Sequence, residues 1–275
     1  MEAKLGISLS RQYKVPITEA LPLIRQVGFS AVSPLWGTKV NMEEICLTAK
    51  QCGLALQSLH APFGGTDTLW SSDPAVFGKS LGFVMQALDD CIRFGIPVMV
   101  MHAWIDNGLC YDMQNLYFGN FDAVVKKASD HGVQIAFENT EGEKFLFALL
   151  AHYKDNLSVG FCWDSGHEKC YNHDQDLLSI YGDRLLMVHL NDNLGISDPG
   201  GSITYLDDLH LVPYDGCMDW PRTMQRLSKC RPIPYLNFEL SLVSKPGRNE
   251  NEVYAQMPLA DFYALAYERG RKLLL

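Results

Sequence analysis

The sequence predicts an α/β fold, a (β/α)8 barrel formed as a single domain over residues 1–275. Short apolar runs rich in Val, Ile and Leu alternate with amphipathic stretches, which is typical of parallel strands covered by helices. Eight such units fit into 275 residues, the usual size of this barrel. Amphipathic stretches end in glycine at 28, 53 and 132, as helix C-termini commonly do.

Strands are expected where the apolar runs lie. They cover residues 4–9, 29–35, 55–61, 98–103, 133–139, 158–164, 185–191 and 235–240. Helices are expected where apolar residues recur at i, i+3 and i+4. They cover residues 17–28, 41–53, 75–95, 120–132, 145–153, 176–183, 219–230 and 258–275. The longest interruption, 193–218, follows the seventh strand, and a loop of that length in a compact domain is usually functional.

An open, doubly wound sheet is the alternative architecture. Its nucleotide-binding form carries a glycine-rich GxGxxG or Walker loop after the first strand. The segment that follows residue 9 has neither pattern. The barrel is therefore the preferred prediction, and no nucleotide cofactor is expected.

Composition and charge narrow the class of protein. Hydrophobic residues make up 47% of the chain, which is enough for a sizeable core. The net charge of −9, without a basic patch, disfavours contact with phosphate backbones, so no nucleic-acid partner is expected. No apolar run approaches the roughly 18 residues of a membrane span. The N-terminus does not resemble a signal peptide and the eight cysteines form no CxxC pair, so we expect a reduced, cytoplasmic protein without a zinc finger.

Carboxylate and imidazole side chains follow six successive predicted strands and recur in the long loop. The set is His60, His102, Glu138, Asp164, His167, His189, Asp208, His210 and Glu239. In a barrel the carboxyl ends of the strands converge on one face. Four carboxylates gathered there would repel each other, and a divalent cation would remove that repulsion. The mixture of imidazole and carboxylate suits Zn²⁺, Mn²⁺, Co²⁺ or Fe²⁺ better than Ca²⁺.

Taken singly, each of these residues has an ordinary structural interpretation. A lone His60 or His102 at a strand end is most often hydrogen-bonded to a loop, and Asp164 could cap a following helix. Nine groups also exceed the four to six ligands that one ion takes. Either several ions bind, or some of the groups hold substrate.

The strand-end motifs together resemble the xylose isomerase-like TIM barrel superfamily and, within it, the sugar phosphate isomerase/epimerase group. In chain order they are HAPF, MHAW, FENTEG, WDSGH, VHLND, DLHLVPYDGCMDW and FEL, so the resemblance covers nearly the whole chain. It implies one divalent metal ion, Zn, Mn, Co or Mg, held by Glu138, Asp164, His189 and Glu239. It also implies that Glu138 and Glu239 are the catalytic residues that move protons, and that His167 binds substrate.

The activity implied by the resemblance is a metal-dependent sugar, sugar phosphate or keto-polyol isomerase or epimerase that acts through a metal-stabilised enediolate. The partner is then a small sugar or polyol. Trp36, Phe63 and Trp104 follow strand ends and could wall it, although ordinary loop packing explains each of them equally well. Related barrels often pair, which leaves a homo-oligomer open.

Two other functions stay open on the same residues. Apurinic-site endonucleases share this architecture and hold three zinc ions with nine ligands, all of which have counterparts here. The additional ligands would be His60, His102, His167, Asp208 and His210. A non-catalytic sugar-binding barrel is the third candidate.

Overall fold

The computed structural model describes residues 4–10, 12–106 and 108–274. Their strands are β1 (Lys4–Ser8), β2 (Ala31–Ser33), β3 (Ala55–Leu56), β4 (Leu59–His60), β5 (Val98–His102), β6 (Gln134–Glu138), β7 (Val159–Asp164), β8 (Leu185–His189) and β9 (Tyr235–Phe238). Parallel pairing joins them into two sheets, in the orders β3-β2-β1-β9 and β4-β5-β6-β7-β8.

Two isolated parallel bridges join these sheets into a ring. One pairs Leu35, just after β2, with His60 of β4, and the other pairs Leu190, just after β8, with Phe238 of β9. At the second junction the Leu190 N–H donates to the Asn237 carbonyl at 2.8 Å. The sheet therefore closes on itself, which confirms the expected (β/α)8 barrel.

The third expected strand, 55–61, forms as two short pieces, β3 and β4, one in each sheet. The residues between them enter a buried polar network. Ser58 Oγ lies 2.7 Å from Ser33 Oγ, and the Gln57 amide donates to Asn237. The two pieces together fill one of the eight strand positions of the barrel.

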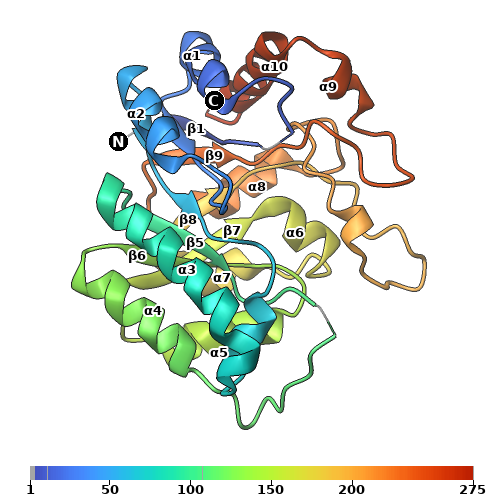
Figure 1. Cartoon of the computed structure of the whole chain (residues 1–275). Coiled ribbons are helices and arrows are strands. Elements are labelled where there is room, and N and C mark those ends of the chain that lie inside the picture. The colour runs from blue at the N-terminus through green and yellow to red at the C-terminus, as the bar shows by residue number, and fades with distance from the viewer. Residues whose placement is uncertain (1–3, 11, 107, 275) are drawn as a thin grey trace.

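Helices cover the outside of the barrel (Figure 1). They are α1 (Ile17–Val27), α2 (Met42–Gln51), α3 (Pro74–Phe94), α4 (Gly119–Asp130), α5 (Glu143–His152), α6 (Ser165–Cys170), α7 (Leu177–Tyr181), α8 (Trp220–Leu227), α9 (Glu252–Gln256) and α10 (Leu259–Lys272). Short 3₁₀ turns are η1 (Thr66–Trp70), η2 (Gly182–Arg184) and η3 (Tyr205–Asp207). Each expected helix is present with closely similar bounds, whereas α6 and α9 were not expected.

Local chemistry explains where the helices begin and end. At the start of α3 the Asp73 carboxylate accepts a hydrogen bond from the Ala75 N–H at 2.9 Å. The helix ends at Gly95, whose φ of 69° is left-handed. Gly28, Gly53 and Gly132 also have positive φ, which confirms their expected positions at helix ends.

Alternation along the strands determines which side chains enter the barrel. In β5, residues 98, 100 and 102 share one face, and in β6 residues 134, 136 and 138 do the same. Val98, Val100 and Ala136 belong to a small apolar cluster separate from the main core. The same alternation places His102 and Glu138 inside the barrel at the carboxyl ends of their strands. The apolar cluster and the polar residues at the strand ends thus belong to the same inward-facing side of the sheet.

All eight cysteines are free thiols.

Within the part of the chain that the structure describes, no helix has both the length and the apolar character of a membrane span.

Candidate metal centre

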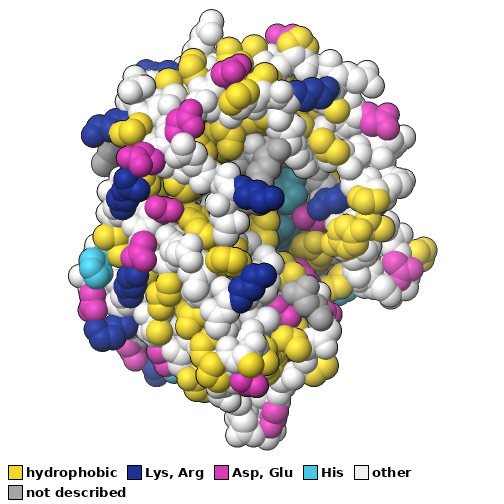
Figure 2. Space-filling view, in the orientation of Figure 1, with side chains coloured by type: hydrophobic (Ala, Val, Ile, Leu, Met, Phe, Trp, Pro, Cys, Tyr) yellow, Lys and Arg dark blue, Asp and Glu magenta, His cyan; other side chains and the backbone are white. Residues whose placement is uncertain are grey.

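The carboxyl ends of the strands surround a cavity of about 440 Å³, seen in Figure 2 as a hollow with imidazole groups inside. Five of the nine expected residues line it: His102, His167, Asp208, His210 and Glu239. The other four are buried and contact members of that first group: His60, Glu138, Asp164 and His189. The fold thus brings all nine residues together.

Glu138, at the end of β6, is the hub of the buried layer. Its Oε2 lies 3.0 Å from His60 Nε2 and 3.3 Å from His102 Nε2, and its Oε1 lies 2.8 Å from His189 Nδ1. Burial alone would raise the pKa of Glu138. The positive field of His189 and the hydrogen bonds from His102, His189 and His60 outweigh burial and hold the pKa well below its usual range.

His189 joins the two glutamates. Its Nδ1 lies 2.8 Å from Glu138 Oε1 and 3.0 Å from Glu239 Oε2. Glu239 follows β9, and its side chain is 18% exposed to the cavity, while Glu138 and His189 are fully enclosed. Burial would raise the pKa of Glu239, but His189 outweighs it and lowers the pKa to about 2. Two carboxylates therefore face one imidazole, and only one of them reaches the cavity.

Asp164 ends β7 and begins α6. Its Oδ1 accepts a hydrogen bond from the His167 N–H at 2.7 Å, which caps the helix, and its Oδ2 accepts from Asn191 Nδ2 at 2.9 Å. Burial raises the pKa of Asp164 to about 6, because His167 and His210 only partly offset the cost of enclosing the charge. The carboxylate thus lies where an additional positive charge would stabilise it.

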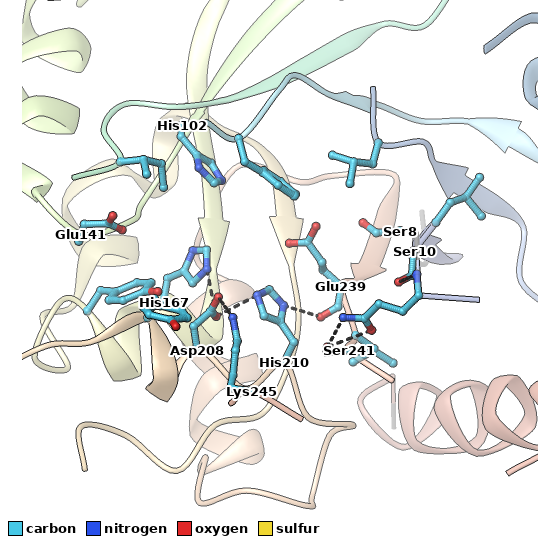
Figure 3. Close-up of a pocket in the computed structure, with 18 residues that line it drawn as sticks. Ser8, Ser10, His102, Glu141, His167, Asp208, His210, Glu239, Ser241 and Lys245 are labelled. Atoms are coloured by element: carbon cyan, nitrogen blue, oxygen red, sulfur yellow. Dashed lines mark hydrogen bonds and ion pairs between the residues drawn. The ribbon is translucent and has the colours of Figure 1, made fainter. Parts of the chain in front are cut away.

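A second group lies toward the opening of the cavity (Figure 3). Asp208 Oδ1 is 2.9 Å from His210 Nε2 and 3.3 Å from His167 Nε2, and Asp208 Oδ2 is 3.1 Å from Lys245 Nζ. His210 Nδ1 donates to the Glu239 carbonyl at 2.9 Å. This group is linked to the buried layer through His167, whose Nδ1 lies 3.5 Å from Glu138 Oε1.

The donor set fits a divalent ion. One ligand atom from each of Glu138, Asp164, His189 and Glu239 lies within 4.8 Å of the others. His60, Glu138 and His189 meet the same condition, and so do Asp164, His167 and His210. Two buried carboxylates, Glu138 and Asp164, and the partly exposed Glu239 lie beside imidazole nitrogen, a donor mixture that suits a transition-metal ion. His167 and His210 offset only part of the cost of burying the Asp164 carboxylate, so a further positive charge beside it would stabilise its ionised form.

Comparison with known proteins agrees with this geometry. A family model described as xylose isomerase-like TIM barrel matches residues 21–242, a range that contains all nine site residues. The chain belongs to the xylose isomerase-like TIM barrel family. A relative that is similar in sequence is the uncharacterized protein y4fM of Sinorhizobium fredii (strain NBRC 101917 / NGR234). It is 28% identical over 266 residues, which covers 83% of this chain and 82% of y4fM.

Solved structures share the architecture of this xylose isomerase-like barrel. The IolI protein, solved with a bound zinc atom, superposes with a TM-score of 0.77 at 13% identity and covers 98% of both chains. The D-psicose 3-epimerase from Clostridium cellulolyticum H10, solved with D-tagatose, has a TM-score of 0.70 at 15% identity and covers 98% of this chain and 99% of its own. At these identities the similarity shows the fold alone.

Of the three aromatic residues expected to wall a substrate, only Phe63 lines the cavity of this family member. Its ring lies 4.4 Å from the His60 ring and 5.2 Å from the His102 ring. Trp36 is buried and donates its indole N–H to Asp90 on α3. Trp104 is buried and stacks on Phe145 at 4.0 Å. The expectation that Trp36 and Trp104 wall a substrate is therefore corrected. Both rings pack inside the protein, because each is already enclosed by a neighbouring helix.

Two asparagines in the sequence motifs position the site, although sequence reasoning did not single them out. Asn139 accepts from the Asp164 N–H at 2.8 Å and donates to the Asp164 carbonyl at 2.9 Å, and its own carbonyl accepts from His167 Nδ1 at 2.8 Å. Asn191 donates to the Asp164 carboxylate. Their places in ENT and HLND, directly after Glu138 and near His189, were the available signal.

Asp192 organises the long loop that carries Asp208 and His210. Its carboxylate accepts from the Tyr214 N–H and the Trp220 indole, both at 2.8 Å, and from the Asn193 and Met218 N–H groups at 2.9 and 3.1 Å. A backbone bridge also pairs Asp192 with Leu211. The expected loop is thus a folded structure built around one buried carboxylate.

The remaining cavity wall combines neutral polar groups with the aliphatic side chains of Leu9, Leu35, Ile105 and Leu240. Sequence reasoning missed Ser8, Ser10, Gln12, Glu141, Tyr171, Tyr205, Ser241 and Lys245. Gln12 Nε2 donates to Ser241 Oγ at 2.9 Å, which links the segments that follow β1 and β9. Strand alternation would have indicated Ser8, whereas the loop residues follow no pattern. Hydroxyl and amide groups of this kind suit hydroxyl-bearing ligands.

Proposed function

We propose that this chain is a divalent-metal-dependent isomerase or epimerase of a sugar or keto-polyol. The observation that carries the proposal is the pair Glu138 and Glu239, which approach His189 Nδ1 from two strands at 2.8 and 3.0 Å. Moving a proton between neighbouring carbons, or across one carbon, requires one group to remove it and one to return it. The similarity to a D-psicose 3-epimerase supports this reaction class.

Glu138, Asp164, His189 and Glu239 are the residues that would hold the ion. A divalent cation there would supply Lewis-acid polarisation of a substrate carbonyl. Similarity to the IolI structure, which was solved with a bound zinc atom, supports a metal in this barrel. Asn139 and Asn191 orient Asp164 through the hydrogen bonds described above, as supporting groups of metal ligands do.

The two glutamates have unequal access to a substrate. Glu239 lines the cavity, and the lowered pKa keeps its carboxylate ionised, so it is the group we assign to proton removal. Glu138 is fully enclosed behind it and is ionised as well, so we assign it to the return of a proton that it must first take up. His167 lines the cavity, and we assign it to substrate binding, in which its Nε2 would exchange the contact with Asp208 for one with a substrate oxygen.

The test is exchange of substrate hydrogen with solvent deuterium in the metal-loaded enzyme. NMR would follow D-fructose, D-psicose, D-tagatose and L-ribulose. We expect wild type to exchange at least one of them, and Glu239→Gln, kept at saturating metal because it lacks one ligand carboxylate, to lose about 100-fold or more of the rate. Glu141→Gln, another carboxylate of the cavity wall, is the matched control and should exchange at nearly the wild-type rate.

Exchange by Glu239→Gln at the wild-type rate would show that the proton-removal assignment is wrong. If wild type exchanges hydrogen on none of these four sugars, this class of substrate is excluded.

A second candidate function is favoured by one observation. All nine counterparts of the three-zinc ligands converge, and they form overlapping groups that could hold more than one ion. The alternative is a metal-dependent phosphodiesterase of the apurinic-site endonuclease type. The number of ions per chain separates the two proposals, because an isomerase of this kind needs one.

A further inference from the structure

Lys245 is the only Lys or Arg among the described residues that line the cavity. Its Nζ lies 3.1 Å from Asp208 Oδ2 and 6.0 Å from the centre of the Tyr205 ring. The Lys245 side chain is 24% exposed and that of Asp208 is 14% exposed. Figure 3 shows the ammonium and the imidazoles of His167 and His210 directed at the same carboxylate.

The segment that carries Lys245 is fixed to the long loop. Arg248 pairs with Asp207 Oδ1 at 2.8 Å. Asn251 Nδ2 donates to the carbonyls of Leu209 and Ser241, both at 3.0 Å. These contacts lie on both sides of Asp208 in sequence. They hold the ammonium against Asp208, so this lysine differs from a freely moving surface side chain.

The Asp208 group resembles a metal site in composition. Asp208 Oδ1 faces two imidazoles, and His167 and His210 belong with Asp164 to a set of donors close enough to share an ion. What differs from the Glu138 group is the source of positive charge. The outer oxygen of Asp208 already faces an ammonium that the chain itself supplies.

We propose that the Lys245 ammonium takes the place of a second divalent cation, so that the centre holds a single ion on Glu138, Asp164, His189 and Glu239. The inference rests on the metal centre of the proposed function. A cation bound between Asp208 and the two imidazoles would lie beside the ammonium, and the two positive charges would repel each other. The Nε2 atoms of His167 and His210 then face Asp208 and not a second metal ion.

The experiment counts zinc ions per chain. Wild type, Lys245→Met and Lys127→Met are saturated with Zn²⁺, freed of loosely bound metal by gel filtration and measured by elemental analysis. Lys127 is the matched control, since it also pairs with a carboxylate, Asp89, and its side chain is 31% exposed on α4. We expect one ion in wild type and in Lys127→Met, and two in Lys245→Met. Adding Asp208→Asn to Lys245→Met should return the count to one.

The outcomes separate this inference from the proposed function. One ion in Lys245→Met overturns the inference and leaves the single-ion isomerase intact. Two or more ions in wild type overturn both, and an empty wild-type site overturns the metal centre itself. If Lys245→Met has lost its circular dichroism signal, Lys245→Gln replaces it, and one ion in a folded Lys245→Gln overturns the inference equally.

Discussion

His210 adopts a backbone conformation that few residues other than glycine use, with φ at 49°. Two contacts hold it there. Its ring Nδ1 donates to the Glu239 carbonyl, and the Ser241 N–H donates to the His210 carbonyl, both at 2.9 Å. The strained residue therefore fastens the long loop to the end of β9 and aims Nε2 at Asp208.

The charge on His210 makes the stability of the EDTA-treated, metal-free protein sensitive to alkaline pH. Burial lowers the pKa of His210, but Asp208 outweighs burial and raises the pKa from 6.5 to about 9. A raised histidine pKa stabilises the fold fully below pH 6.5, and that contribution is lost as the pH rises through about 9. The shift corresponds to about 3 kcal/mol in the free energy of unfolding.

Urea unfolding of the EDTA-treated protein at pH 6.5 and 9 measures this loss. His210→Asn is the comparison, because asparagine tolerates positive φ and does not titrate in this range. Wild type should lose about 3 kcal/mol more than the variant between the two pH values. Equal losses would show that His210 is not charged in the metal-free protein.

Sequence reasoning identified the inner residues of the site better than the outer ones. Glu138 and His102 were predictable because strand alternation forces them inward at a strand end. Trp36 and Trp104 follow strand ends too, but bulky rings pack against whichever helix lies nearest, which no local pattern reveals. Lys245 was not predictable, because its position depends on contacts between two long loops.

Among the elements, α6 has a double use that its sequence, in the segment FCWDSGHEKC (161–170), does not reveal. The two interpretations of Asp164, helix cap and metal ligand, are compatible in this structure, because Oδ1 caps the helix while Oδ2 faces Asn191. The helix places His167 one turn after Asp164 and toward the cavity. A six-residue helix is too short to produce a periodic signal, which is why the sequence did not predict it.

Substituting Asp164 separates these two uses. Asp164→Asn keeps an oxygen that can cap α6, whereas Asp164→Ala removes it and should lose about 1 kcal/mol relative to asparagine. Both variants should bind Zn²⁺ at least about tenfold more weakly than wild type, since each lacks the carboxylate. Thermal unfolding of the EDTA-treated variants measures the loss of the cap, and calorimetric titration with zinc measures the loss of the ligand. Undiminished zinc affinity in Asp164→Asn would exclude Asp164 as a ligand.

At the scale of the whole molecule, the order of strands and helices was predictable and the path of residues 193–218 was not. Apolar runs report burial, and eight buried parallel strands have few ways to close. The loop has no such run. Its shape depends on four N–H groups that converge on Asp192, a tertiary arrangement that becomes visible only when the chain is folded.

The charge of the whole molecule bears on the choice between sugar and nucleic acid. The chain carries a net charge of −9, and the one ammonium among the described residues of the cavity wall is paired with Asp208. Affinity for duplex DNA comes mainly from contacts between cationic side chains and phosphates.

We therefore expect neither binding nor cleavage of a fluorescent duplex with one abasic site, in zinc-loaded protein at about 150 mM salt. Anisotropy and gel assays measure both, and a characterised abasic-site endonuclease is the positive control. Cleavage at nanomolar enzyme would reverse the order of the two proposed functions, whatever the net charge.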